Sequence, residues 1–411
     1  MGRRTQGFLT TTRRGLFRAG VATGIAVASI GVLAGCKHKD DGSTRPTVVD
    51  GGSADYVIDP STNESNYSSA ELSLKETGSW TIAVGNVLKP SEGSLVAATT
   101  AGSSAAPMVK ASTFSISSGA ISELVTEPVA DDKGNVVIYD VGCSDSVYAW
   151  VELNLLTHDW ALYATALSSG KLAGDPTSLW SAGADWDPAS FVVSGKMVIW
   201  QVMPSNSGSR RSEHSYCYLW TVGDSSATTA VDSPGRFGTA PTVSDGIVTL
   251  TPRVNADAGT YYGITAYGLS DGMGSQIDQL VLPSEVKPFS AVRMGDDFAF
   301  SIEANYSSGG LLGQMGTYIG HGEGPFVALS REPSAPVAGK GSVYIVRANA
   351  SYFVIDTDAR TYATLPAANR ALDYGEYPVR AGTCDTFVTY ATVKTQDTGY
   401  PESVSVRAFA L

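Results

Sequence analysis

The chain has 411 residues, including 44 glycines and 19 tyrosines, and only 17% of its residues are charged, so it can bury a large core. Its formal net charge of −12 argues against nucleic acid and against electrostatic binding to anionic lipid headgroups. Runs of β-branched and aromatic residues bounded by Gly, Ser, Asn and Asp, without a helical period, indicate an all-β fold.

Two motifs lie in the first 36 residues, which we expect to be excluded from the fold. The segment TRRGLFR resembles the twin-arginine export motif, with Arg13 and Arg14 as the paired arginines. An apolar stretch, too short and too rich in Gly and Ala for a membrane span, leads to LAGC, which resembles a bacterial lipobox. The resemblance implies that residues 1–35 are a signal peptide and that Cys36 becomes lipidated. An uncleaved signal anchor is the alternative.

This processing would determine both the compartment and the charge of the protein. Residues 1–35 contain five arginines and no acid, so their removal takes the formal net charge from −12 to −17. We expect a strongly acidic protein on the extracytoplasmic face of the cell membrane, anchored there by its lipid. Twin-arginine export would also imply that the chain folds before translocation.

After Cys36, the segment up to residue 69 is predicted to be a flexible tether. It is polar, rich in Gly, Ser, Asp and Asn, and has no sustained hydrophobic period. The first ordered strand is predicted at 70–75 (AELSLK), where apolar and polar residues alternate.

A unit of about 50 residues recurs along the rest of the chain. Its clearest copy, 136–170, reads as three short strands separated by polar turns. Taking Trp150 in its middle strand as an anchor, equivalent positions are Ala98, Trp200, Leu250, Phe300, Ile345 and Tyr390. This repeat length in an all-β chain is typical of four-stranded propeller blades. We therefore predict a seven-bladed β-propeller over residues 70–411.

Both ends of the chain are expected to take part in closing the ring. The last repeat ends at Leu411, in a segment that aligns with the third strand of a blade, so this blade lacks its outer strand. Propellers protect such edges by letting a strand from the other terminus complete the blade. The strand 70–75 is predicted to do so, and 80–84 is predicted to open the first complete blade.

The remaining motifs give little support for enzymatic chemistry. No GxSxG, HExxH, P-loop or GxGxxG signature occurs in a fitting context. The glycines around His321 and the short acidic segment 356–358 are interpreted as turns. Three further cysteines, Cys143, Cys217 and Cys384, cannot form a complete disulfide framework, and a Cys143–Cys384 pair stays open. No metal centre or cofactor is predicted.

Functional residues are expected on one face of the ring, which carries the loops between second and third strands and the linkers between blades. The longest such loop, 204–215, holds several charges, and one linker places Trp186 between two aspartates. A following linker contains Arg236 and Phe237. The candidate ligand-binding residues are Asp185, Trp186, Asp187, Arg210, Arg211, Glu213, His214 and Arg253. Asn residues that recur past each anchor, such as Asn154, are interpreted as turn formers.

These residue types suit an acidic or sugar-bearing ligand. A guanidinium group binds carboxylates through paired hydrogen bonds, and an exposed indole offers a stacking plane. A solvated hairpin tip, whose charges serve only solubility, is the alternative interpretation of the loop 204–215.

Repeats such as PVAGKGSVYIVRANASYFVIDTDARTYATL resemble those of the broad TolB-like and WD-like propellers of bacterial envelopes. The resemblance covers residues 70–411 and rests on the blade pattern. The chain lacks the GH…WD pair and the S-x-D-x-G-x-x-W Asp-box, and the second departure argues against sialidase-like activity. The resemblance implies a binding platform for a protein or a glycan.

Two hypotheses about function follow. The first is a monomeric, non-enzymatic surface lipoprotein that binds an envelope protein or glycan on one propeller face. The second is a hydrolase or lyase of envelope polysaccharide or peptidoglycan. Its acids and bases would be Asp185, Asp187, Glu213 and His214. General acid–base catalysis needs two such groups converging across one pocket.

Overall fold

The computed structural model describes residues 54–101, 108–256, 259–283, 286–302, 315–331, 335–348, 351–367 and 377–411. Arg13, Arg14, Cys36 and the tether up to residue 53 lie outside them. The chain divides into two units, and the fold described here belongs to the second, Arg45–Leu411. In the described ranges the backbone forms strands, turns and loops, and none of it is a helix that could cross a membrane.

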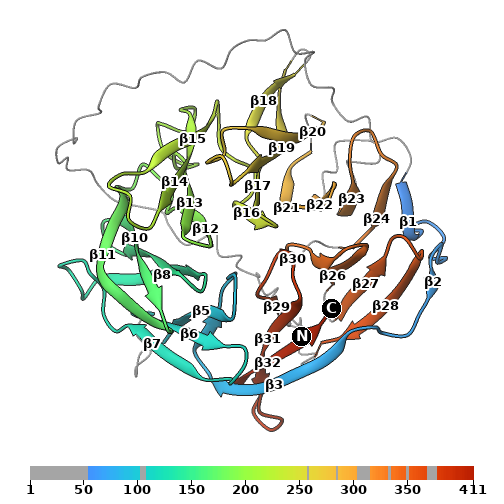
Figure 1. Ribbon diagram of the computed structural model, residues 1–411, viewed down its shortest axis with the longest axis horizontal. Coiled ribbons are helices and arrows are strands. Elements are labelled where there is room, and N and C mark those ends of the chain that lie inside the picture. The colour runs from blue at the N-terminus through green and yellow to red at the C-terminus, as the bar shows by residue number, and fades with distance from the viewer. Residues whose placement is uncertain are drawn as a thin grey trace, which may run out of the picture. The chain divides into compact units, whose positions relative to one another are not determined.

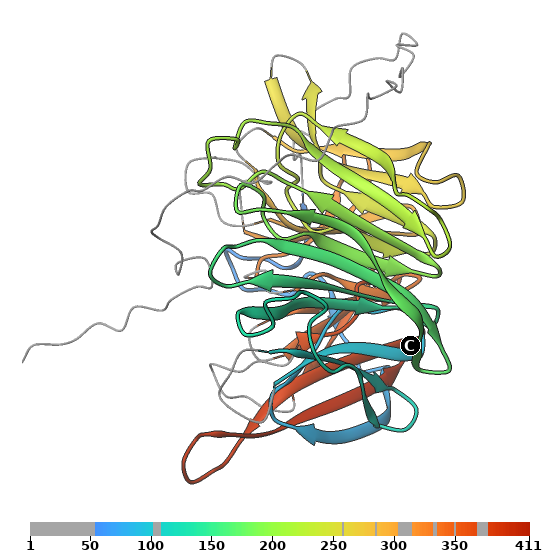
Figure 2. The ribbon, with the colours of Figure 1, turned by 90° about the vertical axis from the view of Figure 1, so that its left-hand side faces the viewer.

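The strands form sheets around a common centre, which is the architecture of a β-propeller (Figure 1). Six sheets each contain four or five strands from one continuous stretch of chain, and we call these sets of strands blades 1 to 6 in chain order. The sheets of blades 5 and 6 also take up strands from elsewhere in the chain. A further sheet combines strands from both ends of the described chain, and we call it the composite sheet. From the side, the sheets follow one another as twisted layers (Figure 2).

Blade 1 contains β4 (Asn86–Leu88), β5 (Leu95–Thr100), β6 (Lys110–Ser115) and β7 (Ile121–Val125). Blade 2 contains β8 (Val136–Cys143), β9 (Val147–Asn154), β10 (Trp160–Ser168) and β11 (Lys171–Ala182). Blade 3 contains β12 (Ser190–Ser194), β13 (Met197–Val202), β14 (Ser215–Thr221) and β15 (Thr228–Ser233).

Blade 4 contains β16 (Thr242–Ser244), β17 (Ile247–Leu250), β18 (Arg253–Ala256), β19 (Gly259–Gly268) and β20 (Gln276–Val281). Blade 5 contains β21 (Pro288–Met294), β22 (Asp297–Ile302), β23 (Gly316–Gly320) and β24 (Phe326–Leu329). Blade 6 contains β25 (Ala338–Lys340), β26 (Val343–Arg347), β27 (Ser351–Asp356) and β28 (Thr361–Pro366). The composite sheet contains β29 (Tyr377–Pro378), β31 (Thr386–Lys394), β32 (Pro401–Ala410) and β3 (Lys75–Ala83).

The inner strands are hydrophobic on both faces because neighbouring sheets pack face to face. In β9, for example, all residues from Val147 to Leu153 are buried. Seven hydrophobic clusters occur in the described part of the ring, and each joins two neighbouring sheets. The repeat is confirmed at its anchors, which all lie on the second strand of their own sheet: Ala98, Trp150, Trp200, Leu250, Phe300, Ile345 and Tyr390.

The number of blades differs from the prediction. The sequence predicts seven blades, the last of them completed by an N-terminal strand, whereas six blades are present beside the composite sheet. The last repeat departs from the pattern because its inner segment is divided between two sheets. Tyr377–Pro378 (β29) pairs with β31, but β30 (Gly382–Thr383) pairs in parallel with β25 of blade 6.

Residues 379–384 run through the middle of the ring, where Figure 1 shows β30. The Arg380 guanidinium donates to the Gly93 carbonyl of blade 1. The backbone N–H of Thr383 donates to Ser244 Oγ of blade 4 at 3.0 Å. One short segment therefore contacts sheets on different sides of the centre.

The first described residues run along the outer edges of three successive sheets, seen as the blue stretch in Figure 1. Strand β1 (Ala54–Ile58) pairs in parallel with β24, and β2 (Ser68–Ser69) pairs in parallel with β28. Strand β3 then pairs antiparallel with β32. The tether predicted up to residue 69 is therefore wrong for residues 54–69, which are part of the ring.

The strand beside β32 also lies further along the chain than predicted. The prediction was 70–75, but the pairing runs from Lys75 to Ala83 and includes most of the segment 80–84 assigned to the first blade. Ile82 packs in the cluster shared with blade 1, whereas Leu74 packs against blade 6 from outside any strand. The alternation in AELSLK thus reflects side-chain packing and not strand pairing.

Candidate functional site

The face predicted to carry function can be defined on blade 3. Strand β12 begins opposite the end of β13, because Ser190 pairs with Gln201. The linker 183–189 and the loop 203–214 therefore leave the blade at the same end. We call this side of the ring the loop face, and the opposite side, with the turns between first and second strands, the hairpin face.

Backbone contacts hold the linker and the loop together. Trp186 and Pro204 form an isolated antiparallel bridge. The N–H of Ser205 donates to the Asp185 carbonyl at 2.8 Å, and the N–H of Asp187 donates to the Met203 carbonyl at 3.0 Å. These bonds bring two segments, separated by one blade hairpin in sequence, into a single surface.

Arg210 lies at the centre of a group of predicted site residues. Its Nε lies 3.9 Å from Asp185 Oδ2 and 3.8 Å from Glu213 Oε1. Its guanidinium carbon lies 6.0 Å from the centre of the Trp186 ring. The side chains of Arg210, Asp185 and Glu213 are 46%, 61% and 49% exposed, so these ion pairs contribute little to stability. We call these four residues the Arg210 cluster.

Trp186 packs against the protein interior on one side and stays partly exposed to solvent. It is partly buried and packs against the hydrophobic cluster that blades 2 and 3 share. Its backbone carbonyl accepts a hydrogen bond from Trp160 Nε1 at 3.0 Å. The ring thus has a fixed position beside the charged groups of the loop.

Arg236 is the main residue that the sequence-based site list missed. Its Nη2 donates to Asp187 Oδ2 at 2.6 Å, and its Nη1 donates to the Pro204 carbonyl. The Arg236 side chain is only 20% exposed, compared with 35% for Asp187. It clamps the linker that follows blade 3 to the base of the loop. Arg236 lies one 50-residue step after Trp186, in a linker already expected on this face, but it was not counted among the candidate ligand-binding residues.

The other predicted residues have separate partners. His214 Nδ1 lies 2.7 Å from Asp232 Oδ1 of β15. The Arg253 guanidinium carbon lies 3.5 Å from the centre of the Tyr262 ring, across the β18–β19 hairpin of blade 4. Arg211 is exposed on the loop next to Arg210. The structure therefore joins Asp185, Trp186, Arg210 and Glu213, and places the rest around them.

The four groups predicted for acid–base catalysis have different partners. Asp187 is engaged by Arg236 and His214 by Asp232. Asp185 and Glu213 both contact one guanidinium group, that of Arg210. Hydrolysis of a glycosidic bond needs one protonated and one ionised carboxyl facing each other across the substrate.

Asn154 behaves as the turn former predicted from the sequence. Its side-chain Oδ1 accepts hydrogen bonds from the N–H groups of Leu156 and Thr157, at 2.9 and 3.1 Å. His158 in the same loop has a φ of 61°. Asn154 therefore shapes its loop through these hydrogen bonds.

The cysteines and the acidic residues offer no metal centre in the part of the chain that the structure covers. There, no group of three or more His, Cys, Asp and Glu side chains could hold a metal ion. Cys143, Cys217 and Cys384 are free thiols and buried, so no Cys143–Cys384 disulfide is present. Burial raises the pKa of Cys143 to about 12 and that of Cys384 to about 11, which makes both unreactive.

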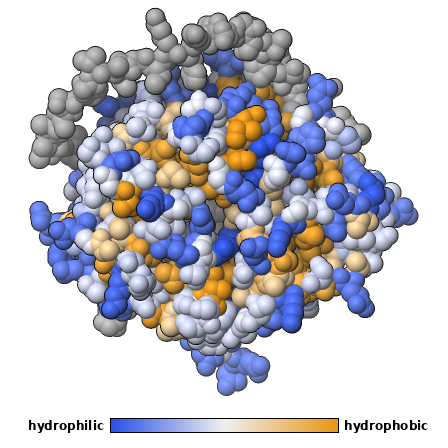
Figure 3. All heavy atoms as spheres, viewed as in Figure 1, coloured by the Kyte–Doolittle hydropathy of each residue, from blue (hydrophilic) through white to orange (hydrophobic). Residues whose placement is uncertain are grey.

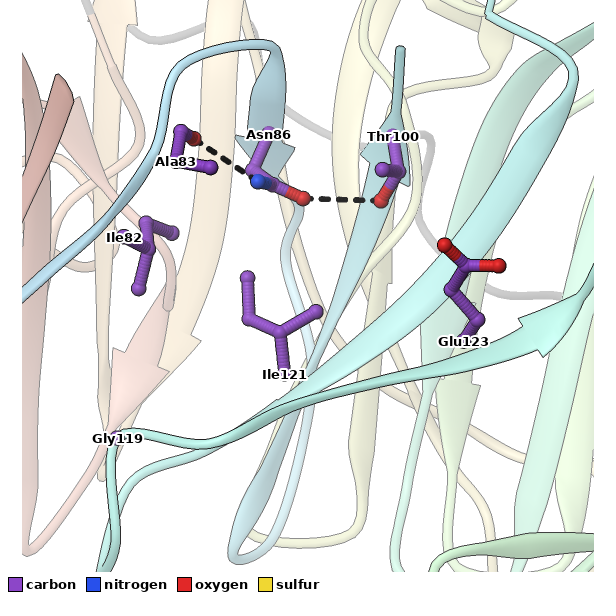
Figure 4. Close-up of a pocket in the computed structure, with 7 residues that line it drawn as sticks. All are labelled: Ile82, Ala83, Asn86, Thr100, Gly119, Ile121 and Glu123. Atoms are coloured by element: carbon purple, nitrogen blue, oxygen red, sulfur yellow. Dashed lines mark hydrogen bonds between the residues drawn. The ribbon is translucent and has the colours of Figure 1, made fainter. Parts of the chain in front are cut away.

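A cavity of about 340 Å³ lies at the seam between the composite sheet and blade 1 (Figure 4). It is lined by Ile82, Ala83, Asn86, Thr100, Gly119, Ile121 and Glu123. Figure 4 shows Asn86 donating to the Ala83 carbonyl and accepting from Thr100, each at 2.9 Å. Glu123 accepts from Lys110 at 3.0 Å. Because its polar groups pair with one another, this hollow is a packing seam between sheets.

Comparisons with known proteins give no family for this chain. No protein-family model matches it, and no curated protein sequence matches it. Solved structures that resemble it include the β-propeller domain of the Trilobed protease from Pyrococcus furiosus, at 11% identity and a TM-score of 0.48, covering 79% of this chain and 94% of that one. Another is a chain of the S. cerevisiae Dbp5 complex with Nup159, Gle1, IP6 and ADP, at 12% identity and a TM-score of 0.48, covering 88% and 100%. Neither similarity bears on the activity or partners of this chain.

Proposed function

We propose that this protein is a lipid-anchored, extracytoplasmic β-propeller that binds a partner of the cell envelope through the loop face of blade 3, without catalysing a reaction. The observation that carries the proposal is the Arg210 cluster. It combines a fixed aromatic ring with charged groups that are half exposed and lack tight internal partners. Such groups, held by loops on a rigid ring, are suited to recognition.

We also propose that the composite sheet serves as a seventh blade that closes the ring. Support comes from its two hydrophobic interfaces. Phe387 meets Tyr352 of blade 6 edge to face at 5.2 Å, and Val388 belongs to the same cluster as Phe114 of blade 1. Strand β3 supplies the outer edge, so the two ends of the described chain are held in one sheet.

The proposed lipid anchor is compatible with exposure of the loop face. Strand β22 ends at the loop face, and β23 pairs antiparallel with it, so β23 ends and β24 begins at the hairpin face. Strand β1 runs parallel to β24. Ala54 therefore lies at the hairpin face. Seventeen residues, 37–53, separate this point from Cys36 in the sequence. The loop face would then be able to point away from the membrane.

The anchor is tested by replacing its cysteine. We expect Cys36→Ala to release the protein from the membrane fraction or to leave an unprocessed precursor, because the lipid supplies the attachment. Membrane fractionation with mass measurement of the N-terminus checks this. A wild-type protein that is freely soluble and still carries residues 19–35 would contradict the proposal.

The binding function is tested by capture from envelope extract. The immobilised mature protein is compared with a Trp186→Ala/Arg210→Ala/Arg211→Ala variant. Lys196→Ala is the matched control, because Lys196 is exposed on the hairpin face of the same blade. We expect the wild type and the control to retain the same ligand and the triple variant to lose it. If the triple variant keeps all of the binding, the site lies elsewhere on the ring.

A further inference from the structure

The charges around the linker and loop of blade 3 leave no positive excess, even when Arg236 of the next linker is counted, because Asp232 lies beside His214. Three carboxylates, from Asp185, Asp187 and Glu213, lie with three guanidinium groups, from Arg210, Arg211 and Arg236. The whole chain is acidic, with a formal net charge of −12. A surface without local positive excess on an acidic protein does not attract an anionic ligand. A cationic ligand would be repelled by the guanidinium groups at short range.

The Arg210 cluster presents hydrogen-bond donors and acceptors that are not paired with each other at hydrogen-bonding distance. Its two ion-pair distances, 3.9 and 3.8 Å, are longer than a hydrogen bond. The guanidinium N–H groups of Arg210 are donors, and the oxygens of Asp185 and Glu213 are acceptors. A ligand that fills this array must donate and accept within a few ångströms, as hydroxyl groups do.

The Trp186 ring sets a second requirement, which is that the ligand must also offer an apolar face for stacking. Trp186 is held by the core of blades 2 and 3 and stays partly exposed beside the array. An indole face packs against the apolar C–H face of a pyranose ring, while the hydroxyls around that ring reach the neighbouring polar groups. A stacking plane next to mixed donors and acceptors therefore matches a sugar better than a flexible anionic peptide.

Resting on the function proposed above, we propose that the Arg210 cluster binds a neutral carbohydrate, an uncharged oligosaccharide with free hydroxyl groups. One sugar ring stacks on Trp186. Its hydroxyls donate to Asp185 and Glu213 and accept from Arg210. Arg236 does not contact the sugar and acts as a positioning residue, because its bonds to Asp187 and Pro204 fix the base of the loop.

The proposal is tested by calorimetric titration of the mature protein with four oligosaccharides of similar length. Three are neutral (maltoheptaose, cellohexaose and fully N-acetylated chitohexaose) and one is anionic (an oligogalacturonate). We expect at least one neutral sugar to bind, with an affinity that changes little between about 0.05 and 0.5 M salt. Trp186→Ala should weaken this binding by about tenfold or more, while Trp186→Phe and Lys196→Ala should retain it.

Two results would overturn the inference. One is preferential binding of the oligogalacturonate that fades with salt, which would assign the site to anions. The other is that no neutral sugar binds while capture from envelope extract still depends on the Arg210 cluster, which would assign it to a different partner. In both cases the proposed binding function stands. It fails separately if the triple variant captures ligand as the wild type does.

Discussion

The segment that crosses the ring centre and the loop of blade 3 place similar groups in different surroundings. At the centre, Thr383 has a 3.0 Å bond to Ser244 of another blade, and Arg380 bonds to a backbone carbonyl. On the loop face, Arg210 contacts its carboxylates only at 3.8–3.9 Å and is about half exposed. The first region links several sheets through hydrogen bonds between the sheets, whereas the second leaves its bonding capacity open to solvent. We infer that the centre serves folding and the loop serves binding.

The same contrast separates two arginines on the loop face. Arg236 is mostly buried and joins two segments through Asp187 and the Pro204 carbonyl. Arg210 has no bond of comparable length. Burial and the number of short partners therefore distinguish a structural arginine from one available to a ligand, although both have the same side chain.

The largest expected effect is loss of the N-terminal strands. Deleting residues 1–83 removes β1, β2 and β3 and uncovers the edges of β24, β28 and β32. We expect this variant to aggregate or to lose its cooperative thermal transition, because three edges and the Ile82 packing face are exposed. Deleting residues 1–53 should leave the melting temperature unchanged. Equal melting of the two proteins, measured by calorimetry, would show that these strands do not close the ring.

The next effect concerns the segment through the ring centre. Gly382 has a φ of 75°, and a β-carbon there would lie 2.6 Å from Ser244 Cβ. We expect Gly382→Ala to lower the free energy of unfolding by about 2–4 kcal/mol, because it adds both strain and a clash. Gly399→Ala is the matched control, since Gly399 has a φ of 69° and open space, and should cost about 1 kcal/mol. Equal losses in urea denaturation would argue against a tightly packed centre.

A smaller difference is expected between the two arginines of the loop face. Arg236→Ala should destabilise the protein by about 1–2 kcal/mol, because it leaves Asp187 without its donor. Arg210→Ala should change stability by less than about 0.5 kcal/mol while reducing ligand binding. Urea unfolding and binding are measured on the same samples. If Arg210→Ala costs as much stability as Arg236→Ala, the division between clamp and ligand group is wrong.

The smallest effect is a pH dependence at β1. The Arg360 guanidinium beside Asp55, aided by the Tyr67 hydroxyl, lowers the pKa of that carboxyl below its usual 3.8. A lowered pKa stabilises the fold above pH 3.8, and this contribution is lost as pH falls through the folded-state value. The stability difference between wild type and Arg360→Ala should thus be constant above about pH 5 and shrink in more acidic solution. A difference that grows on acidification would contradict the assignment.

The repeat and the loop face could be predicted because their signals are local. Trp150, Trp200 and the other anchors follow from strand and turn patterns within about 50 residues, and loops at one end of a blade meet by geometry. The strands at 54–69 could not be recognised, since they are short edge strands that pair with segments far along the chain, as β1 does with β24. The division of the inner segment of the last repeat between two sheets could not be predicted for the same reason, because β30 pairs with β25 of another blade.

The most direct test of the central claim is hydrogen–deuterium exchange of the mature protein, alone and saturated with the envelope fraction that it captures. The account predicts slower exchange at 183–187 and 204–215 on ligand addition, and no change at 54–83 or 379–384. Protection that appears instead around His321 on the hairpin face, with 204–215 unchanged, would contradict it.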